Sequence, residues 1–318
     1  MRAVVIDDNN LTIKECPEPT PGKGELLIRV KAAGINAADL LQLRGMYPAP
    51  LGAPSDIPGL ELAGEVVETG PEVFRFAPGD RVMAIVGGGA QAELAVVHER
   101  QAMPVPETLP FEEAGGVPEA FITADDALFT QCSLSCGERL LVNGGAGGVG
   151  VAAIQLGIAV GATVTATVRN PDLRTKVANL GAKVLAPQEL GNPENKNNFD
   201  VVLELIGAPN LGDDLEALRT GGRICIIGVG AGQHAQLSLL TLMNKRAGIY
   251  GSTLRSRSLE EKAAAARSLE HRVLPLFTQG RIHVPLEASY PLTEARGAYD
   301  RFAKGGKFGK IVLTLTNH

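Results

Sequence analysis

The sequence predicts an α/β protein in which a β-rich domain is interrupted by a doubly wound parallel sheet. Three features of the chain carry this prediction. Short strands separated by Gly and Pro fill residues 1 to about 110. Strands then alternate with helices to about residue 255. A final apolar strand, 309–315, needs a sheet to pair with, and the sheet of the first domain is its expected host.

The overall composition fits a soluble globular protein of two ordinary domains. The chain has 318 residues, of which 45% are hydrophobic and 20% charged. Its formal net charge of -5 disfavours a nucleic-acid partner, which a basic surface would bind. No apolar run approaches the roughly 20 residues of a membrane span, and the first residues enter a strand instead of a signal peptide. Four scattered cysteines give no disulfide framework, so we expect a cytoplasmic protein.

The first 110 residues are predicted to form a small barrel or a pair of packed sheets. Residues 25–31 mix apolar and charged positions in near alternation, as a half-buried strand does. Residues 78–82 form a turn that leads into another strand. A short helix is expected over 37–43. The expected strands are 3–6, 11–15, 25–33, 64–69, 81–85 and 91–97.

Beyond residue 110 the pattern changes to alternating strands and helices. Residues 111–129 look helical, and the polar stretch 187–198 is an expected surface loop. The alternation is typical of a six-stranded, doubly wound parallel sheet, with the last strand at an edge. The expected strands are 139–143, 163–168, 183–185, 201–205, 223–228 and 248–252, and the helices are 149–160, 172–180 and 211–218. A long helix then covers 258–277, where Ser258 can cap the start and Pro275 can stop or bend the end.

A glycine-rich run, 143–150, lies between an apolar strand and an apolar helix. This order forms the phosphate-binding corner of a dinucleotide fold, because bare backbone and a helix N-terminus can both meet a pyrophosphate. The spacing G-x-G-x-x-G fits residues 145–150, although other glycine triplets of the run fit it too. A flexible loop without a ligand is the alternative. The expected cofactor contacts are Gly145, Ala146, Gly147, Gly148 and Val149.

The end of the second parallel strand indicates which nucleotide binds. NAD-binding versions of the fold place an Asp or Glu there, about 20 residues past the glycines, to hold the ribose 2′-hydroxyl. Here residues 166–170 contain no acid, and Arg169 offers a charged fork for a 2′-phosphate. Arg174, one turn into the next helix, can add a second charge. We therefore expect NADPH, the alternative being that Arg169 is only solvated.

Several motifs together identify a family. They lie at 33–39, 58–66, 79–82, 143–150 and 309–313, with further ones at 44–48, 117–124 and 254–258. With these motifs the whole chain resembles the medium-chain dehydrogenase/reductase superfamily, and within it the zinc-free quinone oxidoreductases of the tumour-suppressor-inducible subgroup. The resemblance implies a GroES-like catalytic domain of residues 1–119 and 257–318. An NADP-binding Rossmann domain of residues 120–256 would be inserted into it.

The resemblance also implies that no metal takes part. Zinc-dependent relatives hold their catalytic zinc with a cysteine where Asn36 stands and a histidine where Leu60 stands. Leucine cannot ligate zinc, and a neutral amide ligates it poorly. Cys132 and Cys136 are four residues apart, but no other Cys or His lies nearby in sequence to complete a site. The histidines at 98, 234, 271 and 283 are scattered as well.

Further cofactor contacts follow from the resemblance. It places Asn36 and Thr123 near the nicotinamide ribose and ring, and Leu254 where its backbone meets the carboxamide. Lys310 in the tail is expected toward the cofactor. The ends of the fourth and fifth parallel strands add Gly207, Gly228 and Val229, although these glycines can alternatively serve only as turns.

The residues expected to bind the 2′-phosphate differ from those of relatives. Relatives often carry a Tyr after the third parallel strand and a Lys in the helix before it. This chain has Pro187 and Leu173 or Asp172 in those places. The phosphate contacts are therefore expected around Arg169 and Asn170 instead.

The expected chemistry is hydride transfer to an acceptor that needs no Lewis acid. Quinones and activated enones accept hydride readily, because the product anion is delocalised. Tyr47 is the expected hydrogen-bond donor to the acceptor carbonyl, with Asn36 assisting by position. A Tyr47 packed only against Pro48 is the alternative. Asp39 is expected to tie down its own helix, and Arg255 and Arg257 either border the substrate or face solvent.

The leading hypothesis is therefore an NADPH-dependent quinone oxidoreductase. An NADPH-dependent enone or enoyl-thioester reductase is the nearest alternative. A non-catalytic NADPH-binding sensor or an RNA-binding protein is an alternative of another class, which the acidic net charge disfavours for RNA. The expected partners are a small-molecule quinone or enone and a second copy of the chain, joined along the exposed edge strand 248–252.

Overall fold

The computed structural model describes residues 1–315, which form two compact units. Unit 1 consists of Met1–Ile122, Leu254–Gly305 and the tail from Lys310. Unit 2 consists of Thr123–Thr253 together with the short segment Gly306–Gly309. The junctions lie within a few residues of the expected ones, 119/120 and 256/257. No pattern in the sequence indicated that 306–309 would belong to unit 2.

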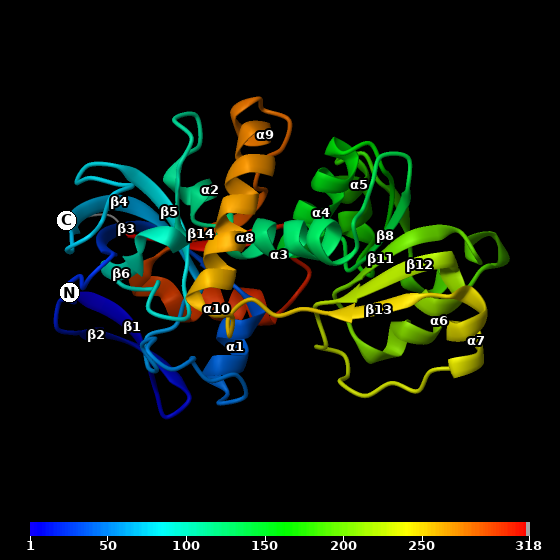
Figure 1. Cartoon of the computed structure of the whole chain (residues 1–318). Coiled ribbons are helices and arrows are strands. Elements are labelled where there is room, and N and C mark those ends of the chain that lie inside the picture. The colour runs from blue at the N-terminus through cyan, green and yellow to red at the C-terminus, as the bar shows by residue number, and fades with distance from the viewer. Residues whose placement is uncertain (316–318) are drawn as a thin grey trace. The chain divides into compact units, whose positions relative to one another are not determined.

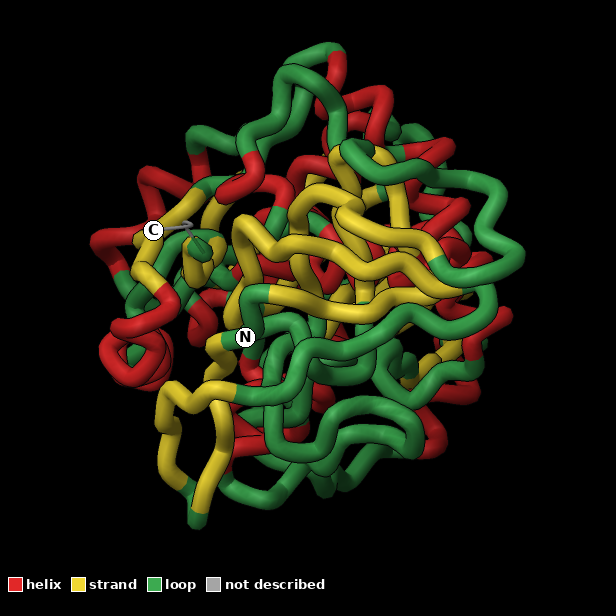
Figure 2. Tube along the Cα trace, turned by 90° about the vertical axis from the view of Figure 1, so that its left-hand side faces the viewer, coloured by secondary structure: helices red, strands yellow, loops and turns green. Residues whose placement is uncertain are grey.

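Unit 1 is built on one antiparallel-rich sheet and a separate hairpin. The sheet follows the order β14-β15-β3-β4-β5-β7, with β6 paired to β3, and the hairpin is β1-β2. In Figure 2, where strands are yellow, several strands of the part that faces the viewer run side by side. Their bounds are β1 Arg2–Asp7, β2 Asn10–Glu15, β3 Glu25–Ile35, β4 Glu61–Thr69, β5 Arg81–Ile85, β6 Leu94–His98, β7 Ala102–Pro104, β14 Leu286–Pro291 and β15 Lys310–Thr314.

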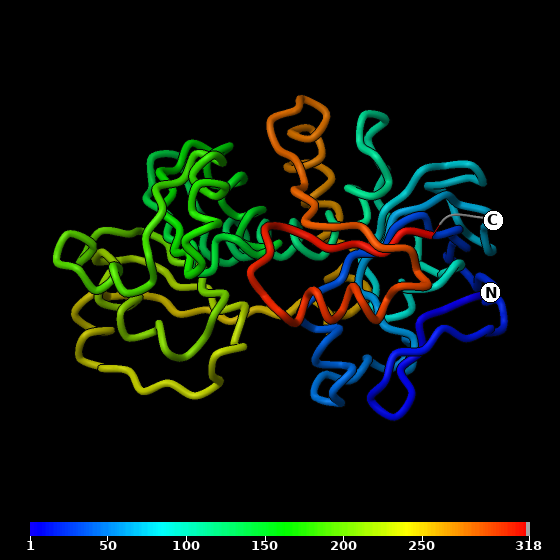
Figure 3. The backbone as a smooth tube through the Cα atoms, turned by 180° about the vertical axis from the view of Figure 1, so that it is seen from behind, coloured from blue at the N-terminus to red at the C-terminus, as the bar shows by residue number. Residues whose placement is uncertain are grey.

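The tail strand joins the sheet of the first domain, as expected. β15 runs antiparallel to β3, with Ile311 opposite Ile35 and Val312 opposite Gly34. In Figure 3 the red tail lies among the blue and cyan strands of the N-terminal part. Fully buried aliphatic side chains of both strands, such as Ile28, Ile35 and Ile311, belong to one core. The hydrophobic effect therefore holds the two ends of the chain in one unit.

One helix expected in unit 1 is two helices in the structure. They are α1 Ala37–Leu43, α2 Phe111–Ala114, α8 Leu259–Arg272, α9 Leu274–Thr278 and α10 Ala295–Ala303, and α3 Pro118–Asp125 crosses into unit 2. The single helix expected over 258–277 is wrong, because the chain breaks at Val273 into α8 and α9. Pro275 sits in the first turn of α9, where its missing N–H costs nothing. Ser258 does cap α8, since its Oγ accepts from the N–H of Glu261 at 3.3 Å.

Unit 2 is the expected doubly wound sheet. Its six strands are parallel and lie in the order β10-β9-β8-β11-β12-β13, which leaves β13 at an edge. Figure 1 shows α4 and α5 over one face and α6 and α7 over the other. The bounds are β8 Arg139–Asn143, β9 Thr163–Thr167, β10 Lys183–Leu185, β11 Phe199–Glu204, β12 Leu218–Ile226 and β13 Gly248–Gly251, with α4 Gly148–Ala159, α5 Arg174–Ala178, α6 Leu211–Ala217 and α7 Leu239–Lys245.

Three local features of unit 2 differ from expectation. The helix expected to reach residue 129 changes at Asp125 into a π-helical segment, Asp126–Gln131. The expected loop 187–198 contains two 3-10 turns, Pro187–Glu189 and Pro193–Asn195. α7 was not expected at all. No helix in the described part of the chain is long and apolar enough to cross a membrane.

Candidate functional site

The glycine run forms a tight loop in front of α4. Gly147 is the N-cap of this twelve-residue helix, and residues 146–149 are partly exposed. A Cβ on Gly145 would lie 2.7 Å from the Cβ of Ala166, and one on Gly150 would lie 2.4 Å from the carbonyl oxygen of Gly144. A side chain at either place would force the loop to shift, so the fold itself requires both glycines, and the register in which the run meets a cofactor stays a prediction. Exposed backbone at a helix N-terminus fits a dinucleotide pyrophosphate.

The segment 306–309 lies against this loop within unit 2. The N–H of Gly309 donates to the carbonyl oxygen of Ala146 at 2.9 Å, and Gly147 and Gly309 form an isolated parallel bridge. The ammonium of Lys176 lies 5.9 Å from the ring centroid of Phe308. The chain just before Lys310 therefore reaches the phosphate loop by its backbone, which sequence reasoning missed.

A buried polar network lies beneath the loop. The Asn143 amide donates to Glu204 Oε2 at 2.7 Å and to Asp214 Oδ1 at 2.6 Å, and its oxygen accepts from Thr167 Oγ1 at 2.9 Å. Burial, and then the charge of Glu204, raises the pKa of Asp214 well above its usual range. The carboxyl pair therefore keeps a proton, which avoids two adjacent buried charges. The network fixes the ends of β8, β9 and β11 relative to one another.

Gly207, Gly228 and Val229 come together at the ends of β11 and β12, as expected from strand order. The N–H of Gly207 donates to Glu204 Oε1 at 2.7 Å. Gly207 has a φ of +119°, and a Cβ there would lie 2.8 Å from Cα of Val229. A Cβ on Gly228 would lie 2.2 Å from the carbonyl oxygen of Leu205. Turn geometry alone thus requires both glycines, and their contact with a cofactor stays a prediction.

Arg169 and Arg174 both lie at the carboxyl end of β9. Arg169 is exposed, two residues beyond the strand. Arg174 is partly buried, and its Nε donates to the carbonyl oxygen of Val168 at 3.2 Å. The Asn170 side chain accepts from the N–H of Asp172 at 3.1 Å and so caps a 3-10 turn, Pro171–Leu173. The two guanidinium groups carry the charge that a 2′-phosphate would need, and the Asn170 amide offers neutral N–H donors.

Unit 1 holds a second cluster, centred on Asn36. Asn36 precedes α1, and its N–H donates to Asp39 Oδ2 at 2.7 Å. Its side-chain amide donates to Glu61 Oε1 at 2.8 Å, while its oxygen accepts from Lys310 Nζ at 2.6 Å. Asp39 Oδ1 also accepts from the N–H of Gly59 at 3.0 Å. Asp39 therefore ties down its helix, as expected.

Lys310 is buried and makes more hydrogen bonds within unit 1 than expected. Its side chain is buried, and Nζ lies 2.5 Å from Oε1 of the fully buried Glu61. Nζ also donates to the carbonyl oxygen of Ile35 at 3.4 Å. The ammonium thus donates all three of its N–H groups to acceptors within unit 1. None is left to donate to a cofactor, so the predicted cofactor contact of Lys310 lacks support. Sequence reasoning missed Glu61, although an acid inside the apolar stretch 58–64 was a visible signal.

Glu119 is a further acid that sequence reasoning missed. It lies in the first turn of α3, and its backbone N–H donates to Glu61 Oε2 at 2.8 Å. Burial, and then the charge of Glu61, raises the pKa of Glu119 to about 8. Burial raises the pKa of Asp39 to about 6. The cluster therefore holds one ion pair, Lys310 with Glu61, and one neutral carboxyl at neutral pH.

Tyr47 lies beside Arg255. The guanidinium carbon is 5.1 Å from the ring centroid, and Nη1 donates to the carbonyl oxygen of Tyr47 at 2.8 Å. Arg255 also donates to Gln42 Oε1 at 2.6 Å and to the carbonyl oxygen of Gly87 at 2.8 Å. Burial, and then the charge of Glu119, raises the pKa of Tyr47. The phenol therefore stays protonated at neutral pH and can donate a hydrogen bond.

Thr123, Leu254 and Leu60 differ in how far they are exposed. Thr123 is partly exposed on α3, and Leu254 is buried next to Arg255. Leu60 is 1% exposed and belongs to the hydrophobic interior. Within residues 1–315, no group of three or more His, Cys, Asp or Glu side chains could hold a metal ion.

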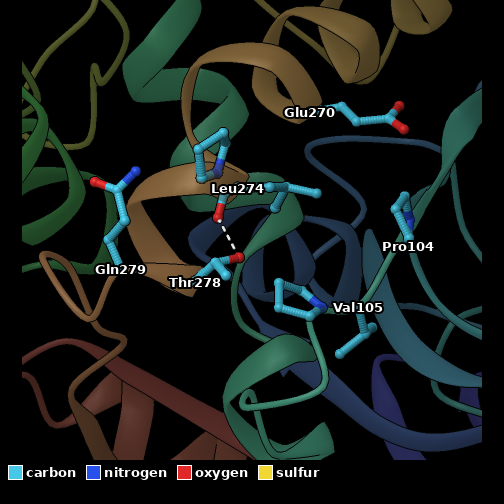
Figure 4. Close-up of a pocket in the computed structure, with 8 residues that line it drawn as sticks. Pro104, Val105, Glu270, Leu274, Thr278 and Gln279 are labelled. Carbon is cyan, nitrogen blue, oxygen red and sulfur yellow. Dashed lines mark hydrogen bonds between the residues drawn. The ribbon is translucent and has the colours of Figure 1, made fainter.

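A separate hollow of about 450 Å³ lies in unit 1 between β7 and the helices α8 and α9 (Figure 4). It is mostly apolar, with the Glu270 carboxylate at one side and the Thr278 hydroxyl bonded to the carbonyl oxygen of Leu274 at 3.2 Å. None of the predicted cofactor or catalytic residues lines it. It is therefore distinct from the clusters described above.

Two family models match the chain. An alcohol dehydrogenase GroES-like domain matches residues 22–107, and a zinc-binding dehydrogenase matches residues 148–270. The chain is 31% identical to quinone oxidoreductase of Rattus norvegicus over 93% of this chain and 91% of that protein. It is 29% identical to acryloyl-coenzyme A reductase of Metallosphaera sedula, over 99% of this chain and 100% of that protein.

Comparison with solved structures points to the same group of proteins. The solved structure of an alcohol dehydrogenase superfamily protein from Novosphingobium aromaticivorans matches with a TM-score of 0.88 and 29% identity, over 99% of this chain and 100% of that one. Sequence identity along nearly the whole chain agrees with a GroES-like unit into which a six-stranded parallel sheet is inserted. The chain therefore belongs to the medium-chain dehydrogenase/reductase superfamily, an oxidoreductase family whose members use nicotinamide cofactors.

Proposed function

We propose that this protein is an NADPH-dependent quinone oxidoreductase that works without zinc. The observation that supports this chemistry is the hydrogen bonding of Asn36. Its amide nitrogen donates to Glu61, and its amide oxygen accepts from Lys310. Leu60, which precedes Glu61 in the chain, is a buried aliphatic residue, so the groups around Asn36 suit hydrogen bonding and not metal ligation. An acceptor that takes hydride without a Lewis acid fits such a site.

The cofactor preference rests on the end of β9. Arg169 is exposed there, and Arg174 is held beside the strand end by its bond to Val168. A bound nicotinamide supplies hydride, and the two guanidinium groups favour the form that carries a 2′-phosphate. The glycine loop and the N-terminus of α4 would hold the pyrophosphate through their N–H groups.

Tyr47 and Asn36 would position the acceptor. The phenol of Tyr47 donates to the acceptor carbonyl oxygen, and Arg255 fixes the backbone and ring of this tyrosine. Asn36, held by Lys310 and Glu61, would present a fixed polar side chain to the acceptor. Orientation and exclusion of water then supply most of the acceleration, as expected for an acceptor whose product anion is already delocalised.

A second candidate is an enone or enoyl-thioester reductase. The relative named acryloyl-coenzyme A reductase, matched over its whole length, favours it. A non-catalytic NADPH-binding protein is a weaker alternative, because a buried neutral acid beside an ion pair and a tyrosine fixed by Arg255 suit catalysis better than cofactor binding alone. We further propose a cytoplasmic homodimer, with no nucleic-acid or membrane partner.

The test is cofactor oxidation measured with a panel of quinones and a panel of 2-alkenals. NADPH and NADH are compared, each with and without a strong zinc chelator. The proposal expects fast quinone turnover, preference for NADPH and no loss with chelator. Turnover of alkenals alone would support the second candidate, inactivation by chelator would contradict zinc independence, and preference for NADH would contradict the role of Arg169.

A further inference from the structure

Glu119 carries a buried carboxyl oxygen that has no hydrogen-bond partner. Its Oε2 is enclosed, while the residue as a whole is partly accessible. An enclosed carboxyl oxygen without a donor is costly as an anion and tolerable as the neutral acid. The side chain is therefore favoured as the protonated carboxylic acid, at a place that solvent only partly reaches.

The surroundings of Glu119 explain why the proton stays. The nearest acid is Glu61 on β4, which also accepts from the backbone N–H of Glu119. Glu61 is already paired with Lys310, so the cation does little to offset a second negative charge. The other charged or titratable groups that face Glu119 come from four further places in unit 1: Asp39 on α1, Tyr47 after α1, Arg255 before α8, and Lys262 on α8.

Glu119 is also better matched to proton delivery than Tyr47. The pKa of a useful general acid lies near the working pH. Burial raises the pKa of Tyr47 above its ordinary value near 10, so the phenol is a poor acid but a sound hydrogen-bond donor. The pKa of Glu119 is raised to about 8, so this carboxyl is protonated at neutral pH and gives up its proton readily.

We propose that Glu119 is the proton donor of the reduction, with Tyr47 positioning the acceptor. The inference rests on the proposed quinone reduction. The quinone takes up hydride, which adds one hydrogen nucleus and two electrons, and negative charge collects on its carbonyl oxygen. The O–H bond of Glu119 breaks, an O–H bond forms on that oxygen, and neutral hydroquinone results. Glu119 is left as a carboxylate near Arg255 and Lys262, and water returns the proton.

The test varies the acidity of the product. Glu119→Gln keeps the shape of the side chain but removes the transferable proton. With quinones whose hydroquinones are weak acids, kcat is expected to fall about a hundredfold. With quinones whose hydroquinones are strong acids, it is expected to change less than about threefold, because their anions leave without protonation. Glu112→Gln, an exposed acid on α2, is the matched control and should leave all rates unchanged.

The pH profile gives a second readout. For weak-acid products, the wild-type rate should fall as the pH rises through about 8, and Glu119→Gln should lack this limb. Glu119→Asp should restore part of the rate together with the limb. Tyr47→Phe should lower the rate but keep the limb, since it only positions the acceptor.

The outcomes separate this inference from the proposed function. If the wild type reduces no quinone, the proposed function fails. If the wild type reduces quinones but Glu119→Gln slows all of them equally, Glu119 is only structural and the inference is overturned. If Glu119→Gln does not fold, the wild-type profile decides, because a rate that stays level to pH 10 with weak-acid products contradicts an acid at this position.

Discussion

Arg169 is the residue on which the proposed preference for NADPH depends. It is exposed beyond β9, so its removal should not disturb packing. Arg169→Ala is expected to raise KM for NADPH about tenfold, equivalent to about 1.4 kcal/mol, and to leave KM for NADH unchanged. Lys183→Ala, an exposed cation on β10, is the control. Equal losses with both nucleotides would show that Arg169 does not read the phosphate.

Tyr47 tests the positioning of the acceptor. Tyr47→Phe keeps the ring under Arg255 but removes the hydroxyl. We expect kcat to fall about tenfold, because a hydrogen bond that only positions the acceptor contributes about 0.5–1.5 kcal/mol. The free energy of unfolding should stay unchanged. Steady-state kinetics with one quinone checks this, and Tyr290→Phe on β14 serves as the control. An unchanged kcat would leave Tyr47 as packing beside Pro48.

Glu119 also predicts how stability varies with pH. Its pKa is about 8 in the folded protein against an ordinary value of 4.5, so the folded state binds the proton more tightly. This contribution is complete below pH 4.5 and is lost as the pH rises to about 8. Urea unfolding at pH 5 and pH 8 should therefore show a smaller decline for Glu119→Gln than for the wild type. An identical decline in both would mean that the carboxyl is solvated.

At the scale of elements, the corner between β8 and α4 is the most constrained part of unit 2. Gly150→Ala places a methyl group 2.4 Å from the carbonyl oxygen of Gly144, so the loop must shift. We expect a loss of about 1–3 kcal/mol in unfolding free energy and weaker dinucleotide binding by titration. Gly212→Ala on α6, where nothing lies within 4 Å, should instead stabilise by about 0.5–1 kcal/mol. Equal effects of the two variants would contradict the tight corner.

Elements with a strong local pattern were predictable, and elements that depend on partners were not. α1, β5, β8 and β10 have their expected bounds because turn residues and apolar runs delimit them. β14 was missed because its half-exposed, mixed sequence becomes a strand only beside β15. The break at Val273 was missed because Leu274 and Phe277 continue an apolar helical pattern across it.

At the scale of the whole molecule, the exposed edge of unit 2 predicts a homodimer. β13 is an edge strand with Tyr250 42% exposed, and the preceding α7 exposes Leu239, Leu240 and Met243. Sedimentation should give twice the chain mass for the wild type. Tyr250→Lys should shift it toward monomer, since a lysine on an edge disfavours strand pairing. Phe74→Lys, at an apolar position in unit 1 that is even more exposed, should have no effect, and a monomeric wild type would contradict the proposal.

The sequence by itself determined the two-domain architecture, the glycine-rich loop before α4 and the absence of an acid after the second parallel strand. These are local patterns, because a strand, a turn or a helix start is encoded by neighbouring residues. Only the tertiary structure showed that Lys310 pairs with Glu61 across 249 residues and that Glu119 lies beside them. Burial and charge contacts of this kind depend on which strands meet in the sheet. Lys310, which we expected near the cofactor, therefore donates a hydrogen bond to Asn36. Glu119 is a carboxyl group that stays protonated at neutral pH.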